Sequence, residues 1–118
     1  MTKLKDLTDR TEALHNRIRA DTIVMDSYRG FVRDLTPARR AEIRAEHDAE
    51  NLAIIRERAA LHRDAISIFE ELLADAIGRE RFEVAARLKT EIEEECVRLA
   101  EAVRQLELID GATVALSV

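Results

Sequence analysis

The chain has 118 residues, with 24 acidic and 19 basic side chains and a formal net charge of −5 at pH 7. Charged residues make up 36% of it and aromatic residues only 3%, with three glycines, one proline and no tryptophan. So few breakers and aromatic side chains suit long helices and suit sheets poorly, while a hydrophobic content of 47% is too high for a disordered chain. We therefore expect a single domain built of helices.

The charge is unevenly distributed, with a net charge of +1 over residues 1–59 and −6 over residues 60–118. Because phosphate binding needs lysine and arginine, the acidic second half argues against a nucleic-acid partner. No apolar run approaches the roughly 18 residues of a membrane span, and the first residues lack the apolar core of a signal peptide. We expect a soluble protein of the cytoplasm, or of a particle assembled there, without a membrane partner.

The first segment repeats apolar or small residues at alternating spacings of three and four, at Leu4, Leu7, Thr11, Leu14, Ile18 and Met25. This pattern predicts an amphipathic helix over residues 3–28. Asp21 lies on the stripe where an apolar residue is expected, so we expect close contact to loosen there. Gly30 is predicted to break the helix.

The second segment begins at Thr36-Pro37, because threonine can cap a helix and proline is tolerated at the first helical position. The pattern then runs to Gly78 and predicts a helix over residues 37–78, about 60 Å long at 1.5 Å per residue. Its heptad stripe consists of Ala38, Ala41, Ala45, Leu52, Ile55, Ala59, Ile66, Phe69, Leu73 and Ala76, with Asp48 and His62 as polar members. We expect His62 to set the register through a hydrogen bond. One compact core cannot cover so long a stripe, so we expect an elongated bundle that oligomerises.

The third segment follows a turn at residues 78–81 and is predicted to be a helix over residues 82–108. Its apolar stripe is Phe82, Ala85, Ala86, Leu88, Ile92, Cys96, Leu99, Val103 and Leu106. Cys96 is the single cysteine, so no intrachain disulfide can form, and its place on this stripe predicts a buried structural residue. Asp110-Gly111 is predicted to end the helix. The alternating Val114, Leu116 and Val118 that follow favour a short strand that pairs with a partner, or else a tail that frays or packs loosely on the bundle.

The predicted fold is therefore all-α: an elongated three-helix bundle or coiled-coil hairpin with one very long central helix and a short strand-like C-terminal tail. Residues 1–110 form a single helical domain, and residues 111–118 form the tail.

Residues 73–92 resemble the UVR motif, a short helical hairpin of excinuclease subunits B and C and of some protease-adaptor and chaperone proteins. The matching core is Phe82-Glu83-x-Ala85-Ala86-x-Leu88-Lys89-x-Glu91-Ile92, with apolar residues at the expected places of the preceding helix, and the resemblance extends over about residues 66–95. The family usually has Arg-Asp where this chain has Lys89-Thr90. Phe82 is expected to close the turn, while small alanines let the two helices approach closely. The resemblance implies a hairpin for protein–protein docking without catalytic residues.

The sequence offers little that supports catalysis or cofactor binding. Its serines lie in no nucleophile-elbow context, and it has no glycine-rich phosphate loop. Glu12-x-x-His15 has the spacing of half a di-iron site, but His47 and His62 lack the matching glutamate three residues earlier. We predict no catalytic, cofactor-binding or metal-binding residues.

We interpret the chain as a non-enzymatic helical assembly component, oligomeric and acting through protein partners, for example in a phage particle or another multi-subunit complex. The predicted partner-binding residues are Phe82, Ala85, Ala86, Leu88, Ile92, Val114, Leu116 and Val118. Two alternatives remain open: an adaptor that docks through the UVR-like hairpin on a DNA-repair or protease complex, and a metal-binding helical-bundle enzyme built on Glu12 and His15.

Overall fold

The computed structural model describes the backbone of residues 2–117 and the side chains of residues 3–109. It contains three α-helices, α1 (Thr2–Phe31), α2 (Pro37–Gly78) and α3 (Phe82–Ser117), and one 3-10 turn, η1 (Val32–Asp34). The molecule measures 65 × 32 × 19 Å along its principal axes, and no strand occurs in the described backbone. The predicted all-α, elongated architecture with a very long second helix is confirmed.

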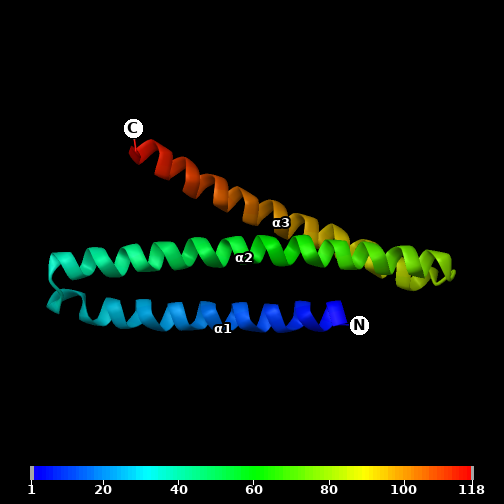
Figure 1. Cartoon of the computed structure of the whole chain (residues 1–118), viewed down its shortest axis with the longest axis horizontal. Helices are drawn as coiled ribbons and strands as arrows, with labels where there is room; N and C mark the ends of the chain where they lie inside the picture. Colours follow the sequence, from blue (N-terminus) through cyan, green and yellow to red (C-terminus); the bar gives the residue numbers. More distant parts are fainter. Residues whose placement is uncertain (1, 118) are drawn as a thin grey trace.

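The long helix α2 lies in the middle of the molecule (Figure 1). Helix α1 runs antiparallel to it on one side, and α3 returns along another side from the turn at residues 79–81. Helix α3 is closest to α2 near this turn and diverges from it toward the C-terminus. Helix α2 therefore contacts both of the other helices, whereas the later part of α3 stands apart from α1.

Gly30 does not end α1, and Thr36-Pro37 sets where α2 begins. Helix α1 continues through Gly30 to Phe31, three residues beyond the predicted end, because a single glycine costs a helix only about 1 kcal/mol. Pro37 disfavours the helical conformation at the residue before it, and Thr36 is accordingly extended, with φ −67° and ψ 154°. The Thr36 hydroxyl accepts a hydrogen bond from the backbone N–H of Arg39 at 3.1 Å, which confirms the predicted cap.

The turn between α2 and α3 places a left-handed residue where the sequence has no glycine. Gly78 is the last residue of α2, and two residues later Glu80 has φ 58°. The N–H of Arg81 donates to the Ala76 carbonyl at 2.8 Å and the N–H of Glu80 to that of Ile77 at 3.0 Å. This is the Schellman arrangement, in which the position of Glu80 is normally glycine.

We expect Glu80→Gly to raise the free energy of unfolding by about 1 kcal/mol, because glycine adopts a positive φ without the steric cost of Cβ. Among the described residues Glu80 has no side-chain hydrogen bond or ion pair to lose. Urea unfolding followed by circular dichroism measures the change. The control is Glu80→Ala, which keeps the Cβ and should leave stability nearly unchanged; an equal gain in both variants would contradict the explanation.

The C-terminus differs from the prediction. Helix α3 continues past Asp110-Gly111 to Ser117, so the predicted break and strand-like tail are wrong for the described backbone. A lone strand would leave its backbone N–H and C=O groups unpaired within the chain, whereas a helix pairs them internally and tolerates one glycine at about 1 kcal/mol. The side chains of Val114 and Leu116, and the whole of Val118, lie outside the described residues.

Helix α2 buries two stripes, although the sequence predicts one. On the predicted stripe Ile55, Ala59 and Ala76 are buried, while its first members, Ala38, Ala41 and Ala45, are exposed. The second stripe includes Ile54 and Leu61, which form a core cluster with Leu14 of α1, with Leu7 and Ile18 packed against it. A helix that contacts two neighbours must bury two faces, and the apolar residues spaced by seven at Ile54, Leu61 and Ile68 were the available signal.

Candidate protein-interaction site

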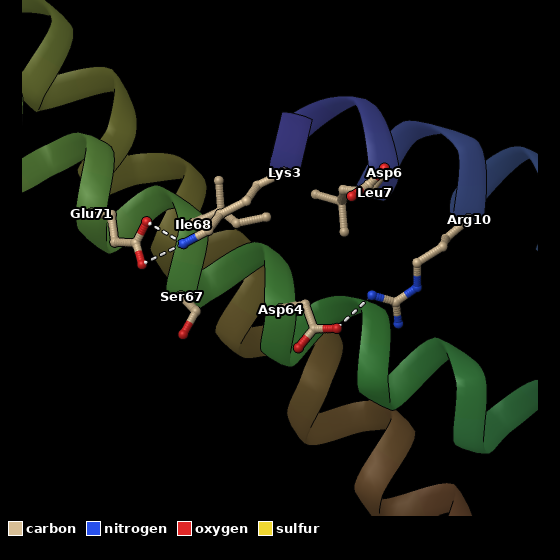
Figure 2. A pocket seen from close by; sticks show the side chains of 8 residues that line it. All are labelled: Lys3, Asp6, Leu7, Arg10, Asp64, Ser67, Ile68 and Glu71. Carbon is tan, nitrogen blue, oxygen red and sulfur yellow. Dashed lines mark hydrogen bonds and ion pairs between the residues drawn. The ribbon is translucent and has the colours of Figure 1, made fainter. Parts of the chain in front are cut away.

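A rim of ion pairs joins α1 to α2 along one edge. Its members recur every seven residues: Lys3, Arg10 and Arg17 on α1, and Glu50, Glu57, Asp64 and Glu71 on α2. Lys3 Nζ lies 3.1 Å from Glu71, and Arg10 reaches both Asp64, at 2.5 Å, and Glu57, at 3.2 Å. Figure 2 shows the Lys3–Glu71 and Arg10–Asp64 pairs crossing the open groove between the two helices. The equal seven-residue spacing on both helices supports one antiparallel register.

The rim also shifts the pKa values of its members. The hydrogen bond to Asp64 is the main cause that raises the pKa of Arg10 above its ordinary value. The Arg17 guanidinium lowers the pKa of Glu50 below its ordinary 4.5, chiefly by hydrogen bonding. These charged groups are therefore engaged with each other, which leaves them less available to an outside ligand.

We expect the Arg17–Glu50 pair to stabilise the protein at neutral pH and to lose this effect in acid. Because the folded pKa of Glu50 is lowered, the stabilisation is complete above pH 4.5 and disappears as the pH falls through the lower folded value. Urea unfolding at pH 7 and pH 3 should show that Glu50→Gln costs more stability at pH 7 than at pH 3. In an Arg17→Gln background Glu50→Gln should have no pH-dependent effect; the same pH dependence there would contradict this assignment.

Each contact of α2 with a neighbouring helix contains one histidine–carboxylate pair. His47 Nδ1 lies 3.1 Å from Asp21 Oδ1 of α1, and His62 Nδ1 lies 2.5 Å from Glu95 Oε2 of α3. The predicted hydrogen bond of His62 is thus confirmed. Asp21, where contact was expected to loosen, instead meets His47 across the two helices. Glu95 also accepts a hydrogen bond from Arg98 at 2.8 Å.

Glu95, and not Cys96, occupies the inward position of α3. The side chain of Glu95 is 13% exposed, whereas Cys96 is exposed, so the prediction of a buried cysteine is wrong. The three-four spacing that continues from Leu88 and Ile92 reaches position 95 and then Leu99. A stripe predicted from apolar residues alone places Cys96 inward in preference to the charged Glu95, although His62 on the facing stripe of α2 indicates a polar partner there.

The end of the α2–α3 hairpin projects beyond α1. Because Lys3 of α1 lies opposite Glu71, the last turns of α2 and the first of α3 extend past the N-terminus of α1 as two helices only (Figure 1). We call this segment, residues 72–88, the hairpin end. Its exposed large apolar side chains are Leu72, Ile77, Phe82 and Val84. These residues leave apolar side-chain area exposed at the hairpin end.

The residues predicted to bind a partner through the hairpin fall into two groups. Ala85 is buried, and Leu88 and Ile92 are half-buried, so these three contribute to packing within the chain. Phe82 is 66% exposed and Ala86 is exposed, so both are accessible. The expectation that Phe82 closes the turn is therefore wrong: the backbone hydrogen bonds around Glu80 close it instead. Ile77 and Val84 were not predicted.

The residues considered for a metal site are not brought together. Glu12 and His15 are both exposed on α1, while His47 and His62 are each hydrogen-bonded to a carboxylate of a different helix. No group of three or more histidine, cysteine, aspartate or glutamate residues among the described ones is placed to hold a metal ion.

Comparison with known proteins gives no relative: no family model, curated protein or solved structure matches the chain. Over the described residues, none of the helices combines the length and the apolar character needed to cross a membrane. The interpretation of function therefore depends on the surfaces described above.

Proposed function

We propose that this chain is a non-enzymatic helical assembly protein of the cytoplasm, which binds further protein chains through surfaces that its own helices leave uncovered. A component of a phage particle or of another multi-subunit complex fits this description. The proposal includes self-association, as expected for a helix as long as α2.

The observation that carries the proposal is the placement of the exposed large apolar side chains. They lie on surfaces that the other helices of the chain leave uncovered: Ile23, Val24 and Phe31 near the end of α1, the apolar residues of the hairpin end, and Val97 and Leu108 on α3. Single exposed apolar residues are common, but large ones that gather at ends and uncovered faces are typical of interaction surfaces. The buried core is correspondingly small, and no large side chain among the described residues is fully buried.

Crosslinking in the native host followed by mass spectrometry of the proteins that co-purify with the tagged chain tests this function. Recovery of the chain itself, or of the subunits of one complex, supports an assembly role. Recovery of no protein partner, together with a monomeric native mass, would contradict it.

A second candidate is an adaptor that docks through the UVR-like hairpin on a DNA-repair or protease complex. The projection of the hairpin end, with Phe82 exposed, favours it. Because Phe82 makes little contact within the chain, Phe82→Ser should abolish capture of such subunits without unfolding the protein. Val24→Ser, an equally polar change at an exposed position of α1 outside the hairpin end, is the control. Undiminished capture by Phe82→Ser would exclude this candidate.

A further inference from the structure

A solvent-exposed side of α3, outside the stripe that packs on α2, carries a short repeat of its own. The residues of α3 that pack inward follow the three-four spacing Ala85, Leu88, Ile92, Glu95, Leu99 and Ala102. Outside this stripe a second three-four series consists of exposed residues, Val97, Glu101, Arg104 and Leu108, which we call the outer face of α3. Val97 is 71% exposed and Leu108 is 66% exposed.

This face borders α2 but stays open: Val97, Glu101 and Arg104 line an open groove with Arg58 and His62 of α2, and Leu108 lines another with Ile54 and Ile55. Helix α1 lies across α2 from it, and α3 diverges from α2 along this stretch (Figure 1). The large apolar side chains of Val97 and Leu108 are thus exposed at the two ends of the face, with Glu101 and Arg104 between them. These two charged residues pair with each other along the helix at 3.3 Å.

We propose that the outer face of α3 binds the same face of a second copy of this chain, with the two α3 helices antiparallel about a two-fold axis between Ala102 and Val103. The proposal deepens the assembly function above and rests on it. In this register Val97 packs against Leu108 of the second copy. Glu101 lies opposite Arg104 of the second copy, and the symmetry repeats each contact.

Charge complementarity selects this arrangement. In a parallel pair in register, Glu101 would meet Glu101 and Arg104 would meet Arg104, and like charges that face each other oppose association. In the antiparallel pair each Glu101 lies opposite Arg104 of the second copy. The two Val97–Leu108 contacts lie on either side of these charged pairs. The flanking residues also avoid like charges, because Arg98 lies beside Gln105 of the second copy and Glu107 beside Ala100. A self-complementary face of this kind fits a second copy better than an unrelated partner.

Sedimentation analysis of charge-reversed variants tests the proposal. Glu101→Arg alone and Arg104→Glu alone should each weaken the dimer by on the order of tenfold or more, because each places like charges opposite each other. An equimolar mixture of the two variants should associate again, since the two arginines of one chain then face the two glutamates of the other. The double variant Glu101→Arg/Arg104→Glu should also recover self-association.

Restored association in the mixture distinguishes a contact between two chains from an effect of the substitutions within one chain. Both single variants lose the same pair along the helix, so this loss cannot explain why their mixture associates, and circular dichroism checks that each variant remains helical. Wild-type dimers that tolerate both single changes, or a mixture that stays monomeric, would overturn the interface while leaving the assembly function intact. A wild-type chain that stays monomeric at its highest soluble concentration would also overturn it, and the assembly function would then depend on the co-purified partners.

Discussion

Replacing Leu61 by alanine is expected to lower the free energy of unfolding by about 2–4 kcal/mol, the range for removing a buried leucine side chain from a packed core. Leu61 is 5% exposed and belongs to the cluster with Leu14 and Ile54 that joins α1 to α2. Leu14 is the single described residue of α1 that is buried, so α1 has few other contacts to hold it. The change should therefore release α1 in particular.

Urea unfolding measures the loss for Leu61→Ala, and hydrogen exchange of the α1 backbone shows where it occurs. Leu72→Ala is the matched control, because the same atoms are removed from a side chain that is 37% exposed on the same helix. We expect it to cost well under half as much. Equal costs at the two positions, or exchange that increases in α3 and not in α1, would refute this account of how α1 is held.

Removing Glu95 alone is expected to be costly, whereas replacing Glu95 and His62 together is not. Glu95→Ala leaves the ring of His62, 19% exposed, without its partner, and should cost about 1–3 kcal/mol. The double change His62→Leu/Glu95→Leu puts apolar residues at two heptad positions that face each other. We expect it to equal or exceed the wild type in stability, because apolar replacement of a largely buried polar pair is often neutral or stabilising.

Urea unfolding of the wild type, the two single variants and the double variant gives the coupling free energy between His62 and Glu95. Glu93→Ala, at an exposed position of α3 two residues away, controls for the loss of one negative charge from the helix. If Glu95→Ala cost no more than Glu93→Ala, the hydrogen bond between His62 and Glu95 would not contribute to stability. A strongly destabilised double leucine variant would instead show that the polar pair is needed to specify the register.

The features of the fold that depend on nearby residues were predictable. The cap at Thr36, the start of α2 at Pro37 and its end at Gly78 follow from backbone geometry and hydrogen bonds within a few residues. The left-handed conformation of Glu80 was not predicted, because glutamate carries no signal for a positive φ and the turn imposes it.

The interaction surfaces were only partly predictable. Phe82 was identified from the resemblance to a helical hairpin, and the structure leaves it exposed, whereas Ala85 from the same motif is buried. The exposure of Val97 and Leu108 could not be predicted, because the sequence does not distinguish exposed from inward apolar residues of a helix until its neighbours are known. For the same reason the apolar pattern predicts Cys96 at the inward position that Glu95 occupies.

The sequence by itself determined that the chain is helical, roughly where the first two helices begin and end, and that α2 is long, because these properties arise from contacts within one or two turns. Only the tertiary structure decided which faces of α2 are buried, which polar residues pair across the helices and where α3 leaves its neighbour. Those outcomes join residues such as Arg10 and Asp64, or His62 and Glu95, that are tens of positions apart. A heptad stripe states that a face must be covered, but it does not state which helix covers it or in which direction that helix runs.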